Sequence, residues 1–374
     1  MKNFKSGQYV NQGTYRSFIP EEINRNWMLD DMQVIELLSQ ADRQLGRLDM
    51  YSDYTPNIDL FISMHVVKEA TKSSKIEGTK TNIEEALQDR EEIAESQRDD
   101  WEEVQNYIEA LNLTIKSLND LPLSSRLIKM AHRVLLQGVR GKHKIPGQYR
   151  TSQNWIGGAS ISDATFIPPP QQEIPRLMGD LEKFSHNPEI RLPHLLKVGL
   201  IHYQFETIHP FLDGNGRIGR LLITLYLVEK GILKKPILYI SDFLERNRQL
   251  YYENLMKARS SNDIKQWFKF FLVGIIETAK GSIVTFDKIM KLQKEVDLKI
   301  QGLGARTSNA KAVISQLYQQ PLINVQKVAN LTELSLPSAY TLVAELEQLG
   351  ILKETTGAKR GKQYWFYDYI KLFQ

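Results

Sequence analysis

The chain contains 374 residues, of which 42% are hydrophobic and 25% are charged, and it carries a net charge of +4 and no cysteine. The lack of cysteine excludes disulfides, thiolate nucleophiles and cysteine-ligated metals, and the slight net charge indicates no particular partner. No apolar run approaches the ~18 residues that a membrane span needs, and the first residues do not form a secretory signal. We therefore expect a cytoplasmic protein of two or three domains without membrane contacts.

The first third of the chain is expected to be helical after an irregular start over residues 1–30. Apolar residues at helical spacing predict a helix over 58–77, which Asn57 can cap and Gly78 ends. Residues 84–103 hold ten acidic and two basic side chains, which indicates a solvated helical face. The same periodicity places further helices at 31–48, 82–96, 101–118 and 124–136.

A stretch rich in glycine, serine and proline, residues 137–170, interrupts the helices. Gly157-Gly158 and the alternating pattern over 159–167 predict a short β-hairpin in this stretch. Helical spacing then resumes and predicts helices over 172–185, 193–205, 247–258 and 264–280, with a linking helix over 280–299.

A twelve-residue motif, His209-Pro-Phe-Leu-Asp-Gly-Asn-Gly-Arg-Ile-Gly-Arg220, precedes an apolar stripe that continues to Val228. The motif therefore opens a helix, and the free N–H groups of its first turn face whatever the loop holds. Gly214 and Gly216 let the backbone approach an anion closely, and Arg217 lies on one helix face with Arg220. This combination predicts a loop that holds a polyphosphate.

The tail forms a distinct unit after a boundary at Gly302-Leu303-Gly304. Three helix-like stretches are followed by two short strands around a turn rich in glycine, lysine and arginine, at 357–362. That order resembles a winged helix, a relative of the helix-turn-helix. The helix-like stretches are 310–318, 324–329 and 335–349.

The twelve-residue motif matches the signature of Fic-domain proteins, His-Pro-Phe-x-Asp/Glu-Gly-Asn-Gly-Arg-x-x-Arg, at every fixed position. Upstream, Ser73-Ser74-Lys75-Ile76-Glu77-Gly78 resembles the inhibitory motif of the family. The segments at 147–150, 156–158 and 168–170 resemble the region of its substrate-docking flap. The resemblance implies a mainly α fold, with an all-helical Fic core and a short β-hairpin flap. It also implies three parts: an N-terminal helical extension with the inhibitory helix (1–110), the Fic catalytic core (111–285), and a linking helix with the winged-helix-like domain (286–374).

The resemblance implies that the protein transfers AMP from ATP to a Thr, Tyr or Ser hydroxyl of a protein target, with the chain itself as one such target. His209, whose side chain has a pKa near neutrality, would be the base, and Asp213 would hold Mg²⁺. Gly214, Asn215 and Gly216 would cradle the phosphates, with Arg217 and Arg220 on the β- and γ-phosphates. Tyr251 and Tyr252 fall where relatives place an aromatic residue at the nucleotide base, and core packing is the alternative.

Glu77 has a specific implied role. Ser73 and Glu77 lie four residues apart and share a helix face. In the family, the corresponding glutamate pairs with the second motif arginine, here Arg220, and keeps the γ-phosphate from its productive position. The chain is therefore expected to be autoinhibited by its own N-terminal helix.

Three alternatives stay open at this stage. Some relatives remove AMP from modified targets, and others transfer different phosphate-containing groups; the phosphorylating branch typically has lysine where this chain has Gly216. A DNA-binding regulator with a vestigial Fic core is the alternative of another class, because Lys353, Lys359, Arg360 and Lys362 cluster at the expected wing. The presumed recognition helix, 336–349, contains no lysine or arginine, so DNA is weakly supported. Homo-oligomerisation or another protein contact is at least as well supported for the tail.

Overall fold

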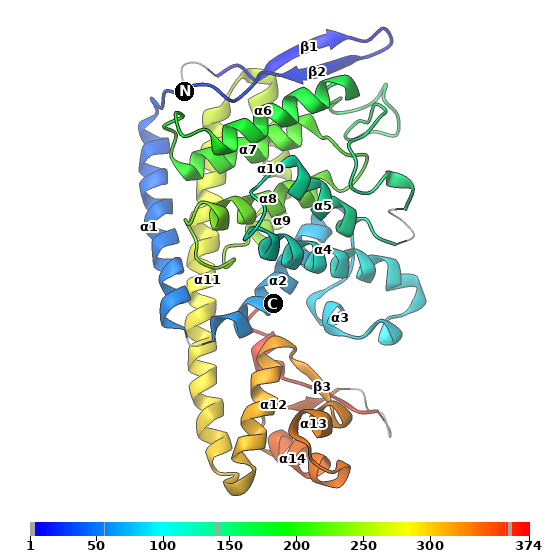
Figure 1. The fold of residues 1–374 in the computed structure, drawn as a ribbon, viewed down its shortest axis with the longest axis vertical. Coiled ribbons are helices and arrows are strands. Elements are labelled where there is room, and N and C mark those ends of the chain that lie inside the picture. The colour runs from blue at the N-terminus through cyan, green and yellow to red at the C-terminus, as the bar shows by residue number, and fades with distance from the viewer. Residues whose placement is uncertain (1–3, 56, 139–141, 356, 358–360) are drawn as a thin grey trace.

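Two long helices, α1 (Met32–Tyr54) and α11 (Ile264–Gln301), run side by side along one edge of the molecule (Figure 1). The computed structural model describes residues 4–55, 57–138, 142–355, 357 and 361–374. The Asp31 side chain caps α1 by accepting from two backbone N–H groups of its first turn. The buried positions of α1 repeat every three or four residues, which forms one apolar stripe. These positions are Val34, Leu38, Ala41, Leu45 and Leu48.

The two helices beside the motif, α7 (His194–Ile208) and α8 (Asn215–Glu229), lie at the centre of the fold. Nearly all of their side chains are buried, which explains why neither helix shows a polar face in the sequence. The surrounding helices are α4 (Arg98–Ser117), α5 (Ser125–Leu135), α6 (Ile174–His186), α9 (Ser241–Arg246) and α10 (Arg248–Ser261). The prediction of a mainly α fold is confirmed.

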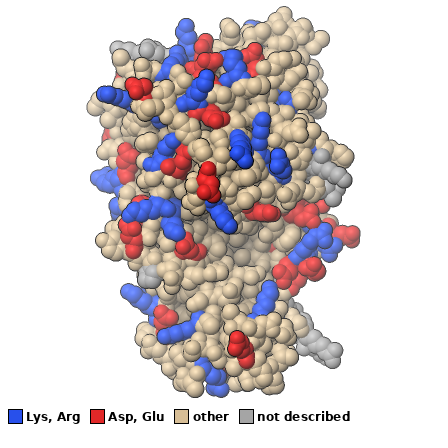
Figure 2. Space-filling view, in the orientation of Figure 1, with Lys and Arg blue, Asp and Glu red and all other residues tan. Residues whose placement is uncertain are grey.

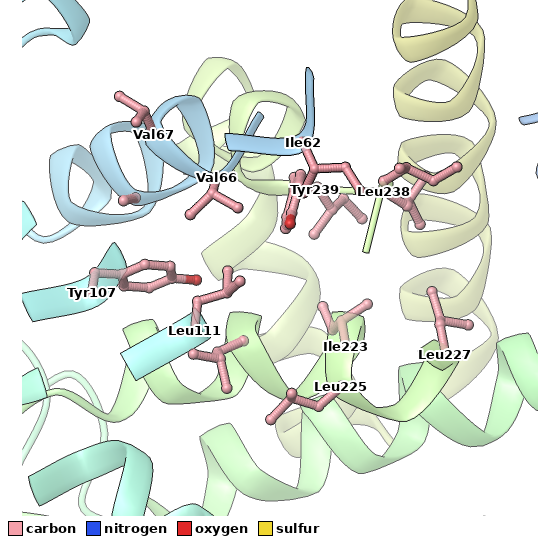
Figure 3. Close-up of a cluster of buried hydrophobic side chains, with 14 of the residues drawn as sticks. Ile62, Val66, Val67, Tyr107, Leu111, Ile223, Leu225, Leu227, Leu238 and Tyr239 are labelled. Atoms are coloured by element: carbon pink, nitrogen blue, oxygen red, sulfur yellow. The ribbon is translucent and has the colours of Figure 1, made fainter. Parts of the chain in front are cut away.

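Helix α2 (Ile58–Ile76) is built into this core. Its Val66 side chain points toward Tyr107 and Leu111 of α4, and Ile62 lies beside Tyr239, in an apolar cluster that also contains side chains of α8 (Figure 3). Asn57 adopts a left-handed conformation and makes no side-chain cap, so the prediction that it caps this helix is wrong. Ile76 is the last residue of the helix and Glu77 is its C-cap, and Gly78 follows at a φ of +106°, a conformation common just after a helix end.

Three sequence-based expectations for the chain outside the core are wrong. The first thirty residues contain an antiparallel hairpin, β1 (Gly7–Asn11) and β2 (Arg16–Pro20). Its Phe18 packs on Phe166, a distant residue that no local pattern reveals. Helix α3 (Ile83–Leu87) ends early, and 3₁₀ turns replace the remainder of the predicted helix over 82–96. The predicted hairpin over 159–167 is reduced to a single bridge between Ile156 and Phe166.

The C-terminal unit contains α12 (Thr307–Gln319), α13 (Val325–Thr332), α14 (Leu336–Gln348) and the short α15 (Tyr367–Ile370). Its strands β3 (Leu322–Asn324), β4 (Lys353–Glu354) and β5 (Gln363–Trp365) form an antiparallel sheet in the order β3-β5-β4. Lys359 and Arg360 of the expected wing lie outside the described residues. The helices predicted over 264–280 and 280–299 form one continuous element, α11, which ends at Gln301.

The C-terminal unit packs on the first half of α2. The Phe61 ring of α2 lies 5.0 Å from the Tyr318 ring and 6.5 Å from the Tyr369 ring, and His65 lies 5.0 Å from Phe373, measured between ring centroids. Ser63 also donates a hydrogen bond to the carbonyl oxygen of Gln319, at 2.9 Å. The tail therefore covers part of the helix whose C-cap is Glu77.

Deleting residues 302–374 should lower the thermal stability of the remaining chain, because it exposes apolar side chains such as Phe61, which is fully buried. Burial of one such side chain contributes ~1.5–3 kcal/mol. Thermal unfolding of the truncated and full-length chains checks this expectation. A double substitution of Phe61 and Tyr318 to alanine in the full chain provides the matched comparison. Equal melting temperatures for all three would contradict a stabilising contact between the tail and α2.

Candidate active site

A cavity of about 520 Å³ lies where α7, α8 and α10 meet the last turn of α2. The segment around the Ile156–Phe166 bridge forms its opposite wall. This size is typical of sites for small molecules and cofactors. The lining residues are Glu77, Trp155, Ile156, Gly157, Thr165, Phe166, Glu206, His209, Gly216, Arg220, Arg248, Tyr251, Tyr252, Leu255, Met256 and Arg259.

His209 follows the last residue of α7 in a left-handed backbone conformation, with φ 48° and ψ 61°. This conformation is uncommon for a non-glycine residue and turns the chain away from α7 into the motif loop. Burial, followed by the positive charges of Arg259 and Arg150, lowers the pKa of His209 to about 3. The imidazole is therefore neutral near pH 7, which leaves a ring nitrogen available for a proton, while the low pKa makes it a weaker base than a free histidine.

Two buried side chains hold the motif loop in place. The Arg150 guanidinium donates to the carbonyl oxygens of His209 (3.0 Å) and Pro169 (2.6 Å), so it joins the loop to the 150–170 segment. His132 accepts from the Gly147 N–H at its Nδ1, which leaves Nε2 to donate to the Asp213 carbonyl oxygen at 3.0 Å. The His132 ring also stacks on buried Phe211 at 3.7 Å. Neither Arg150 nor His132 stood out in the sequence as a support of the loop.

Helix α8 begins inside the motif. Gly214, its N-cap, has a φ of +75°, which is accessible to glycine at little cost. The Asn215 side chain both donates to and accepts from the Phe211 backbone, at 2.8 and 2.9 Å. These bonds engage the Asn215 amide in fixing the loop, so the predicted contact of this residue with phosphate falls mainly to its backbone N–H. Gly216 lines the cavity, and a Cβ at this position would lie 2.2 Å from a carboxylate oxygen of Glu77.

Arg217 and Asp213 form a group of their own beside the loop. The Arg217 guanidinium lies 3.5 Å from an Asp213 carboxylate oxygen and 3.3 Å from one of Glu103. Glu103 also accepts from the Thr79 hydroxyl at 2.9 Å. The expectation that the acidic run over 84–103 is only a solvated face is therefore wrong at Glu103. Within the described residues, neither Arg217 nor Asp213 is among the residues that line the cavity.

Arg220 is fully buried, and within the described residues its hydrogen bonds go to Ser73 of α2 and to Glu77, the residue that follows this helix. Nε donates to the Ser73 hydroxyl at 2.8 Å, and Nη2 donates to the Ser73 carbonyl oxygen at 2.9 Å and to Glu77 Oε1 at 2.7 Å. Burial disfavours the charge of Arg220, but the Glu77 carboxylate, together with Tyr251, Tyr252 and Glu206, outweighs it and raises the pKa of Arg220 above the ordinary value. The sequence-based pairing of Glu77 with Arg220 is thus present as a contact in the structure.

The two tyrosines of α10 differ in their surroundings. Tyr251 is buried, and its hydroxyl bonds to Nε2 of buried His202 at 2.8 Å. Because the other ring nitrogen of His202 faces the Gly219 carbonyl oxygen at 2.8 Å, Nδ1 carries the proton and the tyrosine donates. Tyr252 is 38% exposed, and its ring lies 5.9 Å below the Arg248 guanidinium. Of the two, Tyr252 has the more accessible ring.

The structure also reveals charged residues of the cavity that the sequence analysis did not select. Glu206 of α7 and Arg259 of α10 are 6% and 5% exposed, respectively. The Arg259 guanidinium lies 4.1 Å from the Phe166 ring centroid and donates to the Thr207 hydroxyl at 3.1 Å. One available signal was the position of Glu206, which is the acidic residue of the mostly apolar helix α7 directly before the motif.

Asp213 offers an accessible carboxylate to a Mg²⁺ ion. Its side chain is 46% exposed. Oδ1 accepts from the Gly214 N–H and lies near the Arg217 guanidinium. Among the described residues, no three or more His, Cys, Asp or Glu side chains are grouped to hold a metal. A single accessible carboxylate fits an ion that takes most of its ligands from phosphates and water.

Sequence profiles of one family match two parts of the chain: "Fic/DOC family N-terminal" matches residues 35–116, and "Fic/DOC family" matches residues 122–227. A probable protein adenylyltransferase of Aquifex aeolicus is 27% identical over 250 residues, which cover 65% of this chain and 72% of that protein. The protein adenylyltransferase Fic of Aedes aegypti is 29% identical over 163 residues, which cover 43% of this chain and 29% of that protein. The chain thus spans less than a third of the length of the insect relative.

Solved structures of Fic proteins have a similar fold. A Fic family protein from Desulfovibrio desulfuricans superposes with a TM-score of 0.59 at 19% identity, over 91% of this chain and 98% of that chain. Fic-1 from C. elegans, residues 134–508, superposes with a TM-score of 0.52 at 17% identity, over 70% and 74% of the two chains. None of the described helices has the length and apolar character needed to span a membrane.

Proposed function

The chain belongs to the Fic/DOC family, and we propose that it is a protein adenylyltransferase, an enzyme that transfers AMP from ATP to a hydroxyl group of a protein. The observation that carries the proposal is the meeting of His209, Gly216 and Arg220 around one cavity at the start of α8. A helix N-terminus with a buried guanidinium suits a polyphosphate, and a neutral imidazole suits a proton acceptor. The target is a Thr, Tyr or Ser side chain of another protein or of this chain.

In the proposed reaction, the hydroxyl oxygen of the target forms a bond to the α-phosphorus of ATP. The bond from that phosphorus to the oxygen bridging the α- and β-phosphates breaks, and pyrophosphate leaves. The hydroxyl proton passes to the His209 ring, whose neutral state leaves it ready to accept. The backbone N–H groups of the first turn of α8 and the Arg220 guanidinium would hold the phosphates. Asp213 would hold Mg²⁺, which supplies positive charge to the phosphates when bound.

We further propose that Glu77 keeps this site inactive. Its carboxylate lies 2.7 Å from Arg220 and lines the same cavity as His209. In that position it occupies the guanidinium that the γ-phosphate would need. The carboxylate also fills the space beside Gly216, since a Cβ there would collide with it. Arg220 is therefore engaged before any nucleotide enters.

Incubation with labelled ATP tests the proposed reaction. The chain is incubated with ATP labelled at the α-phosphate and, separately, with ATP labelled at the γ-phosphate, both with and without Glu77→Gly. Protein labelled only from the α position supports transfer of AMP. Protein labelled from the γ position indicates phosphorylation and contradicts the proposal, as does the absence of protein labelling from either position.

Replacing Arg220 by alanine in a Glu77→Gly background should raise the KM for ATP by about 10- to 100-fold. One charge-assisted hydrogen bond contributes ~1.5–3 kcal/mol, and a buried guanidinium directed at a phosphate makes at least one. Initial rates of AMP incorporation at varied ATP check this result. Arg246→Ala is the control, because Arg246 lies on α9 with 56% of its side chain exposed. An unchanged KM for the Arg220 variant would remove its phosphate role.

The reverse direction, removal of AMP from a modified protein, is the second candidate for the same site. The Glu77 side chain is 33% exposed and lines the cavity beside the base, so it can hold a water molecule there. Incubating AMP-modified protein with the parent chain and with Glu77→Gly separates the directions. Release of AMP by the parent alone supports removal, and release by neither chain contradicts it.

For the C-terminal unit, contact with protein is better supported than contact with DNA. Leu336 and Tyr340 of α14 are 47% and 57% exposed, and the helix contains no lysine or arginine. Lysine, arginine and acidic side chains are interspersed over the face of the molecule in Figure 2, without a large patch of one sign. Phosphate contacts dominate nucleic-acid affinity, so a helix without cations is a poor reader of DNA.

A further inference from the structure

Glu206 is a buried carboxylate for which the proposed reaction has no role. It lies on α7, three residues before His209, and lines the same cavity as Arg220. Its side chain packs against α8 at Gly219, where an added Cβ would lie only 2.2 Å from Oε1. Within the described residues Oε1 is buried and has no hydrogen-bond partner. Such an atom carries a substantial cost unless another group compensates it.

Arg220 presents the complementary feature. Its guanidinium is fully buried and, in the part of the chain that the structure describes, its Nη1 has no hydrogen-bond partner. The three bonds that its other nitrogens make all go to Ser73 and Glu77, at the end of α2. Withdrawal of Glu77 therefore removes the one carboxylate that is hydrogen-bonded to Arg220 within the described residues. Buried Glu69 of α2 also interacts with Arg220, but its oxygens already accept from Tyr107 and Ser241. Glu206 is then the carboxylate of the central helices that shares the cavity with it.

We propose that Glu206 is a positioning residue for Arg220: when Glu77 is withdrawn, Glu206 takes over as the anionic neighbour of the guanidinium and keeps it directed at the phosphates. The inference rests on the proposed function. Gly219 makes the arrangement sterically feasible, because a side chain there would displace the carboxylate from α8. Without such a neighbour, a buried guanidinium released from α2 would have to turn toward solvent or pair elsewhere.

The electrostatics of the cavity agree with a transfer of this kind. Burial raises the pKa of Glu206 to about 7, while Arg220 opposes the rise and Glu77 adds to it. Arg259 of α10 also favours the charged form of Glu206, and Tyr251 lies close enough to interact with it. Removing the charge of Glu77 thus favours ionisation of Glu206. Glu206 therefore becomes charged in the same state in which Arg220 has lost its contact with Glu77.

A double-mutant cycle tests the proposal. ATP affinity is measured by calorimetry for the parent, Glu206→Gln, Glu77→Gly and the double variant, with AMP as a ligand that lacks the β- and γ-phosphates. In the Glu77→Gly background, Glu206→Gln should weaken ATP binding about tenfold and leave AMP binding within about twofold. In the parent background, the same substitution should change ATP binding by less than about twofold, because Glu77 still holds Arg220.

Two further variants separate positioning from a structural role. Glu206→Asp retains the charge and should recover part of the lost ATP affinity. Gly219→Ala retains Glu206 but displaces its carboxylate, and it should reproduce the loss even if Glu206→Gln does not fold. Equal losses for ATP and AMP, equal losses in both backgrounds, or no loss would overturn the proposal. Transfer of α-label by Glu77→Gly is measured in parallel, so a failure of the proposed reaction is seen independently of these affinities.

Discussion

Glu77→Gly should raise incorporation of AMP into the protein by about 10- to 100-fold over the parent. The Glu77 carboxylate lies 2.7 Å from a guanidinium that is fully buried, while its own side chain is 33% exposed. A charge-assisted bond of this kind contributes ~1.5–3 kcal/mol, so its loss shifts productive ATP binding by the stated factor. The substitution does not alter His209, Asp213 or Arg217. Because Glu77 is the C-cap that follows the last residue of α2, and Gly78 comes directly after it, only the last turn should fray.

The measurement is label from α-labelled ATP on the protein, with the parent and Glu77→Gln beside the glycine variant. Glu77→Gln retains the shape of the side chain but removes its charge, so it should give an intermediate rate. The double variant Glu77→Gly, His209→Ala gives the rate of labelling in the absence of the proposed base. Equal labelling of the parent and both Glu77 variants, with unchanged ATP affinity, would mean that the observed ion pair has no effect on activity.

His209→Ala in the Glu77→Gly background should lower the rate of AMP transfer by about 10²–10⁴-fold, the usual contribution of a general base. ATP binding should change little, because the imidazole acts on the proton of the target hydroxyl and not on the phosphates. The neutral state of the ring near pH 7 follows from its burial and the nearby guanidinium groups. Rates of labelling and calorimetric ATP affinities, measured on the same samples, check both expectations.

His194→Ala is the matched control for this variant. His194 begins α7, the helix that His209 follows, and its ring bonds to the Tyr226 hydroxyl at 2.9 Å outside the cavity. In the Glu77→Gly background, His194→Ala should transfer AMP at the same rate as Glu77→Gly alone. If His209→Ala retained that rate as well, the assignment of His209 as the base would have to be withdrawn.

Much of the core was predictable because its helices bury regular apolar stripes. The stripe of α1 and the continuous apolar character of α8 are visible in the sequence. The contact of Glu77 with Arg220 was predictable only through the resemblance to a family, since the two residues are 143 positions apart. Helical spacing alone places Ser73 and Glu77 on one face of α2 but does not say which arginine they meet.

The remaining features depend on distant partners that local patterns do not reveal. The β1–β2 hairpin forms where Phe18 packs on Phe166. Glu103, which was expected on a solvated helix face, pairs with Arg217. Glu206 is buried because Gly219 leaves room for it against α8. A sequence-based prediction of such residues needs the packing of two helices as well as the period of each.

The cavity beside His209 is present while Glu77 still holds Arg220. Glu77 therefore behaves as a tethered competitor for one guanidinium, at an effective concentration set by the helix that carries it, and it leaves room for the rest of a nucleotide. A nucleotide bound beside it would be held without the Arg220 contact. Raising the ATP concentration would then saturate the protein in an unreactive state without separating Glu77 from Arg220. Activation accordingly requires a change in α2, and the supply of nucleotide alone does not provide it.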